Sequence, residues 1–277
     1  MKFYLRFFLL GLLTLSLAFT ACDKDDDDDT VETNPTETLV QYLEQDDFVN
    51  TYMPAMITAQ DVKTENTAGS AYIIDIRSAD DFATGHIANA VNVSLTDVVN
   101  HVESTDLTAF STIVIACYSG QTASYATSIL RLLGHDKVKC LKFGMCSWHA
   151  DFAGSWPSNI SNTYATQFTT DATSKDELGS LPTFTTSSTD GADILNERVD
   201  VVLGEWADAK ITSSVVFDNP ELYYIVNYWP LDAYNLGHIP GAIQYTPKQS
   251  MSLDVDLKTL PTDMPIVVYC YTGQTTA

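Results

Sequence analysis

The chain has 277 residues, of which 45% are hydrophobic and 11% aromatic; this is enough apolar material for about two buried cores and excludes an intrinsically disordered protein. Acidic residues outnumber basic ones 36 to 14, and the net charge of −22 repels phosphate backbones and anionic lipid headgroups. Nucleic acid is therefore not an expected partner.

Residues 1–21 have the pattern of a secretory signal. Lys2 and Arg6 precede an apolar stretch over 7–19 that is too short for a comfortable membrane span. The Thr-Ala-Cys sequence that ends at Cys22 resembles the lipobox of bacterial lipoproteins. This resemblance implies that Cys22 is lipidated and that the chain is exported and anchored to a bacterial membrane, periplasmic or surface-exposed. An ordinary cleaved signal with a chance cysteine is the alternative.

An acidic tether is expected over residues 22–38, which begin with "CDKDDDDD". Like charges keep such a segment solvated and extended, as a tether between an anchor and a folded body would be. Calcium binding is an alternative, but the run lacks the glycine and the distant glutamate of a calcium loop. Acidic runs after the lipidated cysteine also resemble export signals of surface lipoproteins.

The rest of the chain contains an internal repeat. "YIIDIRSADDFATGHIANAVNVS" begins at Tyr72, and "YYIVNYWPLDAYNLGHIPGAIQYT" begins at Tyr223. "CYSGQTAS" from Cys117 likewise recurs as "CYTGQTTA" from Cys270. The long offset indicates a duplicated domain. We expect a first domain, a Ser/Thr-rich linker and a second domain over residues 39–155, 156–188 and 189–277.

Short apolar runs alternate with helical patterns in the first half. Residues 70–76 and 111–117 predict strands covered on both faces, and residues 137–143 predict a further short strand. The apolar spacing of 121–135 predicts a helix that stops at Gly134. Alternation of this kind indicates an α/β fold with an open parallel sheet and helices on both faces. A further helix over 192–209 is expected to lead into the second domain.

Cys117 lies where the second of these strands meets the helix. At this edge of a parallel sheet, the free N–H groups of the loop and first helical turn converge. We expect them to lower the pKa of the Cys117 thiol and to make it nucleophilic. A buried core cysteine is the alternative, and it is the reading we favour for Cys140; Cys146 is open between packing and a second thiol near the site.

At this point three segments resemble a rhodanese domain, the sulfurtransferase fold. They read "DIRSADDFATGHIANAVNV", "IVIACYSGQTAS" and "VKCLKFGMCSWHADF". The resemblance covers about residues 55–152, with a second, incomplete copy over 189–277. It implies two rhodanese-like open parallel-sheet domains with helices on both faces, the second truncated at its C-terminus. It also implies a sulfurtransferase without cofactor or metal.

The resemblance assigns roles to individual residues. Cys117 would accept a sulfane sulfur as a persulfide from thiosulfate or another persulfide and pass it to a thiol or cyanide; Cys270 is the second-copy counterpart. Asp75 and Arg77 would support the site through buried charge pairing, with Asp80 or Asp81 as candidate partners of Arg77. The amides of the loop would cradle the outer sulfur or the substrate anion: Tyr118, Ser119, Gly120, Gln121, Thr122 and Ala123.

His86 and His238 both lie in Gly-His-Ile turns, where the resemblance implies that the ring bonds backbone. Metal ligation is the alternative, but no Cys/His cluster with zinc spacing surrounds either histidine.

Departures from related patterns narrow the expected chemistry. Dual-specificity phosphatases share the fold and carry Arg six residues after the cysteine, where Ala123 and Thr276 stand here; phosphatase chemistry is therefore disfavoured. Neither loop contains Lys or Arg, so capture of thiosulfate should be weak, and a protein or small-molecule persulfide is an equal candidate for the donor.

The second copy has Asn227 and Trp229 in place of the Asp-x-Arg motif. The helix expected after Cys270 is not in the sequence, which indicates a longer protein.

Two other classes of function stay open. One is a non-catalytic rhodanese-fold binding or scaffold module. The other is an extracytoplasmic thiol redox protein in which Cys117 pairs with Cys146 or with another chain.

Overall fold

The structure is a computed structural model that describes residues 33–47, 51, 53 and 55–277. The expected signal over 1–21, Cys22 and most of the expected tether lie outside these residues. The final tether residues are not extended as predicted, because a helix capped by the Asn34 side chain starts at Pro35. No helix within the described ranges combines the length and apolar content needed to cross a bilayer.

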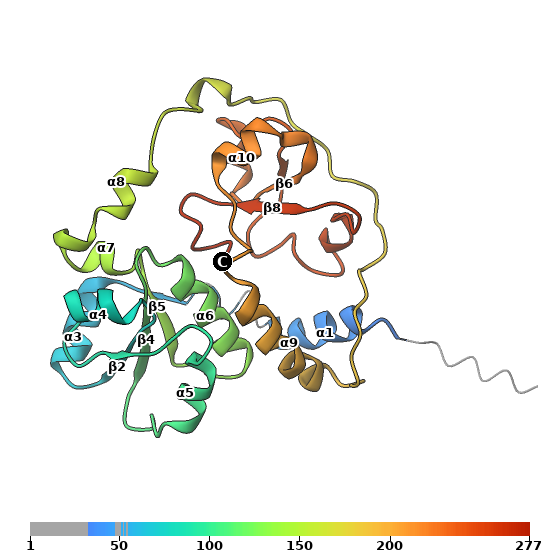
Figure 1. Cartoon of the computed structure of the whole chain (residues 1–277). Helices are drawn as coiled ribbons and strands as arrows, with labels where there is room; N and C mark the ends of the chain where they lie inside the picture. The colour runs from blue at the N-terminus through green and yellow to red at the C-terminus, as the bar shows by residue number, and fades with distance from the viewer. Residues whose placement is uncertain (1–32, 48–50, 52, 54) are drawn as a thin grey trace, which may run out of the picture. The chain divides into compact units, whose positions relative to one another are not determined.

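The first domain is built on a five-stranded parallel sheet with the strand order β1-β5-β4-β2-β3 (Figure 1). The strands are β1 (Met56–Ile57), β2 (Ala71–Asp75), β3 (Val91–Asn92), β4 (Thr112–Ala116) and β5 (Val138–Leu141). β4 is buried along its whole length, as the continuous apolar run predicts.

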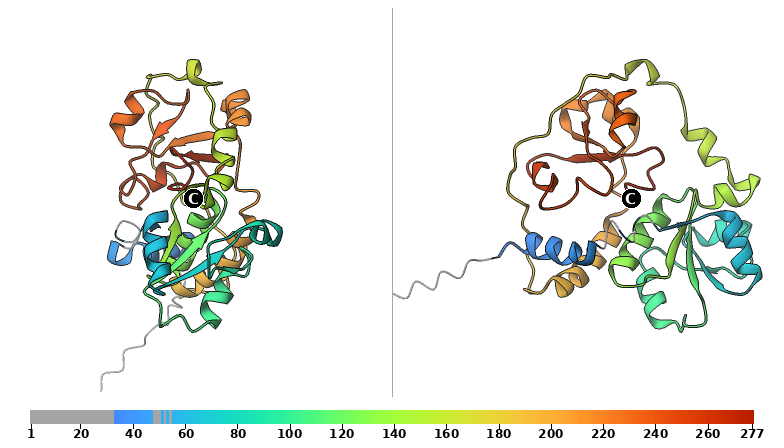
Figure 2. Two further views of the ribbon diagram at one scale, coloured as in Figure 1. Left: turned by 90° about the vertical axis from the view of Figure 1, so that its left-hand side faces the viewer. Right: turned by 180° about the vertical axis from the view of Figure 1, so that it is seen from behind.

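Helices cover both faces of this sheet, which confirms the predicted architecture (Figures 1 and 2). Val98 and Leu130 pack with Ile115 on one face, and Val62 and Met145 pack with Val114 on the other. The helices of this domain are α3 (Ala59–Thr67), α4 (Ala79–Thr84), α5 (Val98–Ser104), α6 (Gln121–Leu132) and α7 (Met145–Trp148), followed by a 3-10 turn, Ala150–Phe152.

α6 is the helix predicted after the first cysteine loop. Gly120, with φ of 91°, precedes it, and Gly134, with φ of 94°, follows it, so glycines with left-handed backbone bound the element. Ala123, Ala126 and Leu130 are fully buried on one face, as their spacing predicts.

The second domain contains a three-stranded parallel sheet with the order β7-β6-β8. Its core holds Tyr245, whose hydroxyl lies 2.9 Å from that of Tyr224 and 2.5 Å from Oγ1 of Thr259. The elements are α10 (Ser213–Asp218), β6 (Tyr224–Asn227), α11 (Leu231–Asn235), β7 (Ile243–Gln244) and β8 (Ile266–Tyr269), with 3-10 turns at Pro220–Leu222 and Leu257–Thr259.

The expected linker is largely irregular, but part of it joins the second sheet. Thr169 forms an antiparallel bridge with His238, and Thr173 forms a parallel bridge with Ile243. Its helical pieces are α8 (Ser155–Asn159) and a 3-10 turn, Ala165–Gln167.

Helix α9 (Gly191–Glu205) forms as predicted, but its buried face packs on the first domain. Leu195, Val199 and Leu203 join the core that contains β4 and α6, whereas the sequence placed this helix at the entrance to the second domain. The apolar faces of α6 and α9 belong to the same core. Sequence periodicity predicts that each helix has an apolar face but not which surface that face packs against. α1 (Pro35–Leu43), followed by a 3-10 turn, Gln45–Asp47, also contacts α9, because Gly191 lies against the Tyr42 side chain.

Substitution of Leu203 should test this packing. Leu203 is 3% exposed, and Leu203→Ala should lower the free energy of unfolding by about 2–5 kcal/mol because it leaves a cavity in the first core. Val201, on the same helix, is 41% exposed, so Val201→Ala should change stability by no more than about 0.5 kcal/mol. Urea unfolding measures both; equal effects would contradict the packing.

Candidate active site

Cys117 follows β4 at the carboxyl edge of the first sheet, as the sequence predicts. Its Sγ accepts hydrogen bonds from the backbone N–H of Gly120, at 3.2 Å, and of Ala123, at 3.3 Å. The left-handed backbone of Gly120 lets the chain curl around the sulfur. The loop therefore points these two N–H donors at any negative charge that develops on sulfur.

Gly144 forms the floor of this loop, and sequence reasoning missed it. The N–H of Met145 donates to the carbonyl of Cys117 at 2.8 Å, and that of Cys146 donates to the carbonyl of Tyr118 at 3.1 Å. A Cβ on Gly144 would stand 2.4 Å from the Cys117 carbonyl oxygen, a distance that no side chain tolerates. The Phe143-Gly144 pair before a short helix indicates a turn in the sequence. Its contact with the cysteine loop joins residues far apart in the chain, which the sequence does not reveal.

The expected lowering of the Cys117 pKa is wrong. Cys117 is 2% exposed, and burial raises the pKa of its thiol although the N–H groups of the loop act in the opposite direction. The cost of desolvating the thiolate outweighs the stabilisation that the N–H donors provide. This cost depends on how completely the surrounding residues cover Cys117.

Arg77 pairs with Asp75 and not with the sequence-expected partners Asp80 or Asp81. Its Nη2 lies 2.7 Å from Asp75 Oδ2 and its Nε 3.0 Å from Oδ1, and both residues are buried. Asp75 is the last residue of β2 and stands two positions before Arg77, so its carboxylate is close enough to pair with the guanidinium. Nη2 also donates to the carbonyl of Gly85 at 2.7 Å, which ties β2 to the Gly-His-Ile turn.

The Tyr118 side chain has a role that the sequence did not indicate. It is 44% exposed and donates its hydroxyl hydrogen bond to Asp81, which also accepts one from Ser78. The hydrogen bonds from Ser78 and Tyr118 lower the pKa of Asp81. The Arg77 guanidinium carbon lies 5.9 Å from the Tyr118 ring centre, so the rim of the loop is linked to the buried ion pair.

The two turn histidines bond backbone, as predicted. Nδ1 of His86 lies 2.8 Å from the carbonyl oxygen of Phe82. His238 repeats this contact with Tyr234 at 2.9 Å, and its Nε2 lies 3.1 Å from the carbonyl oxygen of Asp171.

The remaining described cysteines differ in their surroundings. Cys140 is a core residue, as expected: its Sγ lies 3.1 Å from Ser124 Oγ, and burial raises its pKa to about 11. Cys146 is half-buried beside Ser155. Every cysteine of the described part is a free thiol, so Cys117 and Cys146 are not joined here.

The second cysteine loop repeats the first with different electrostatics. Gly273 donates its N–H to Cys270 Sγ at 3.2 Å. Burial alone would raise the pKa of Cys270, but hydrogen bonds from Thr272, Thr276 and Thr275 outweigh it and lower the pKa. The pKa shifts of the two loop thiols are therefore opposite in direction.

Asn227 occupies the place of Asp75 in the second copy and is fully buried. Its side-chain oxygen accepts from the N–H of Trp229 at 3.2 Å, just as Asp75 accepts from the N–H of Arg77 at 3.0 Å. An amide therefore replaces the carboxylate of the ion pair and keeps the local turn.

Comparisons with known proteins place these features in a family. The profile of the Rhodanese-like domain matches residues 58–151 and 212–277, which together are more than half of the chain. The chain belongs to the rhodanese-like domain family. The two matched segments contain both cysteine loops and every strand of the two sheets except β1.

Two named relatives match about a third of this rhodanese-like chain. Thiosulfate sulfurtransferase GlpE from Pseudomonas fluorescens is 29% identical over 92 residues, which are 33% of this chain and 79% of the relative. GlpE from Shewanella oneidensis is 32% identical over 82 residues, 30% of this chain and 79% of the relative. The solution structure of an Anabaena rhodanese-like domain is 25% identical, with a TM-score of 0.31, and covers 36% of this chain and 76% of its own.

Removal of the Arg77 charge should be costly because Asp75 is left buried and unpaired. Arg77→Met should lower the free energy of unfolding by about 3–5 kcal/mol. The double variant Asp75→Asn/Arg77→Met should recover most of this loss, since the second domain holds Asn227 in the same turn. Urea unfolding of both variants is the measurement, and a double variant no more stable than the single one would contradict the pairing.

Alkylation should distinguish the two loop thiols. At pH 7, Cys270 should react with iodoacetamide about ten-fold faster than Cys117 or more, because its pKa is lowered and that of Cys117 is raised. The Cys117 rate should climb only as pH rises past the ordinary thiol pKa of about 8.5. Peptide mass spectrometry measures both rates; a faster Cys117 at pH 7 would contradict this order.

Proposed function

We propose that this protein transfers sulfane sulfur and carries it as a persulfide on Cys117. The observation that supports the proposal is the cradle of N–H groups, from Gly120 and Ala123, that already points at Cys117 Sγ. The named GlpE relatives, thiosulfate sulfurtransferases, support the same class of reaction.

The reaction requires two displacements at sulfur. The Cys117 thiolate, formed by loss of its proton to solvent, attacks the sulfane sulfur of the donor; the new S–S bond forms as the donor thiolate, or sulfite from thiosulfate, departs. A thiol or cyanide then attacks the outer sulfur, and the Cys117 thiolate is the leaving group. The loop amides stabilise negative charge on sulfur in both steps.

The loop composition favours a persulfide donor over free thiosulfate. Cys117 to Ala123 contains no cation, and the chain carries a net charge of −22. A dianion would therefore meet a repulsive field with only amide dipoles to hold it. Ala123 also occupies the position at which phosphatases carry their phosphate-binding arginine, so phosphoryl transfer is disfavoured.

We place the reaction outside the cytoplasm, on a protein anchored through lipidated Cys22. The support is the sequence alone: the charged start, the short apolar stretch, the Thr-Ala-Cys end and the acidic run. Radiolabelled palmitate incorporation that Cys22→Ser abolishes would test the anchor separately.

Sulfur loading should depend on Cys117. Incubation with a persulfide donor should add about 32 Da per labile sulfur to the intact mass, and cyanide should remove it. Peptide mass mapping should place an adduct on Cys117: Cys117→Ser should lose the adduct at this position, Cys270→Ser should retain it, and Cys146→Ser is the matched control outside both loops. A parent chain whose labile sulfur maps only to peptides other than that of Cys117 would overturn the assignment, and no loading of the parent chain would favour a binding module.

A further inference from the structure

The two cysteine loops contact each other through equivalent residues. Gln121 and Gln274 each lie four positions after their cysteine, and each side chain lies against the glycine of the opposite loop. The contact is therefore reciprocal, although the two loops come from different domains.

Gln274 makes the tighter half of this contact. It is 3% exposed, and its Oε1 accepts the backbone N–H of Phe143 at 2.9 Å. The same oxygen lies 2.5 Å from the point where a Cβ on Gly120 would stand, so the second loop fits only because residue 120 has no side chain.

Gln121 makes the matching half. Its Nε2 donates to the carbonyl of Thr272 at 2.8 Å and lies 2.7 Å from the point where a Cβ on Gly273 would stand. Glycine at both positions thus serves the approach of the opposite loop as well as its own left-handed turn.

We propose that Gln121 and Gln274 form a reciprocal latch, and that Gln274 is a positioning residue which closes the Cys117 loop from the second domain. The latch does not depend on the proposed sulfur transfer, since it concerns access to the thiol itself. Its consequence for turnover rests on that function.

The path from Gln274 to the sulfur is short. Gly120, which Gln274 touches, donates one of the two N–H bonds to Cys117 Sγ. Phe143, which Gln274 bonds, directly precedes Gly144, the residue wedged against the Cys117 carbonyl. The side chain therefore holds the rim and the floor of the loop together.

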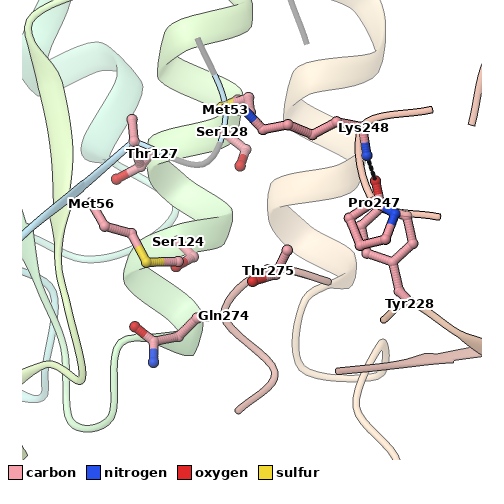
Figure 3. A pocket seen from close by; sticks show the side chains of 11 residues that line it. Met53, Met56, Ser124, Thr127, Ser128, Tyr228, Pro247, Lys248, Gln274 and Thr275 are labelled. Carbon is pink, nitrogen blue, oxygen red and sulfur yellow. Dashed lines mark hydrogen bonds between the residues drawn. The ribbon is translucent and has the colours of Figure 1, made fainter. Parts of the chain in front are cut away.

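The latch has room to open locally. Gln274 also lines a cavity of about 200 Å³, together with Ser124 and Thr127 of α6 and Tyr228 of the second domain (Figure 3). Rotation of the Gln274 side chain into this space would release Gly120 and Phe143 without unfolding either domain. A donor or acceptor would reach Cys117 in that open state.

Alkylation of Cys117 in Gln274 variants tests the latch in the full chain. Gln274→Ala should raise the Cys117 rate with iodoacetamide about five-fold at pH 7, the factor expected for loss of one net hydrogen bond, and should lower the pH midpoint of that rate as water reaches the sulfur. Gln121→Ala should act in the same direction, because it weakens the same contact. Gln167→Ala, an exposed glutamine in the linker, should change neither quantity.

Gln274→Met keeps the side-chain volume but loses the hydrogen bond to Phe143, so its Cys117 alkylation rate should lie between those of the parent chain and Gln274→Ala. This variant tests the latch if Gln274→Ala fails to fold. An unchanged or slower Cys117 rate and an unchanged pH midpoint in the folded variant would overturn the latch. Sulfur loading of the same proteins, measured by intact mass, separates the two proposals. Absence of loading would overturn the transfer function alone, since alkylation requires no transferable sulfur.

Discussion

The parallel register of β2, β4 and β5 determines where each part of the candidate site lies. Asp75 pairs with Ala116, so the buried ion pair stands beside the residue that precedes Cys117. Ile115 pairs with Cys140, which brings the Phe143–Gly144 turn to the same edge. A shift of this register would separate the loop, its floor and its charged support at once.

The two copies of the loop have nearly the same sequence but shift the pKa of their thiols in opposite directions. The backbone arrangement around sulfur is common to both, as the bonds from Gly120 and Gly273 show. Solvent access differs: Cys117 is almost completely covered, and Cys270 is only half-buried. The amide cradle is therefore a shared scaffold, and covering by neighbouring elements decides which thiol ionises more easily.

Local features of the fold and site could be predicted from the sequence, and non-local ones could not. The α6 helix, the strand-to-helix corner at Cys117 and the backbone contacts of His86 each depend on residues close in the chain. The partner of Arg77, the Gly144 floor and the packing of α9 depend on which surfaces meet after folding. The sign of the Cys117 pKa shift also required the extent of burial, which no motif encodes.

The segment between the two sheets takes an unusual route (Figure 1). Residues 169–173 lie against β7 and the His238 turn of the second domain, and α9 then returns to the core of the first. The polypeptide thus crosses between the domains more than once. A single proteolytic cut between Thr173 and α9 would separate residues 169–173 from the second sheet and α9 from the first core, so the two halves should resist dissection into autonomous modules.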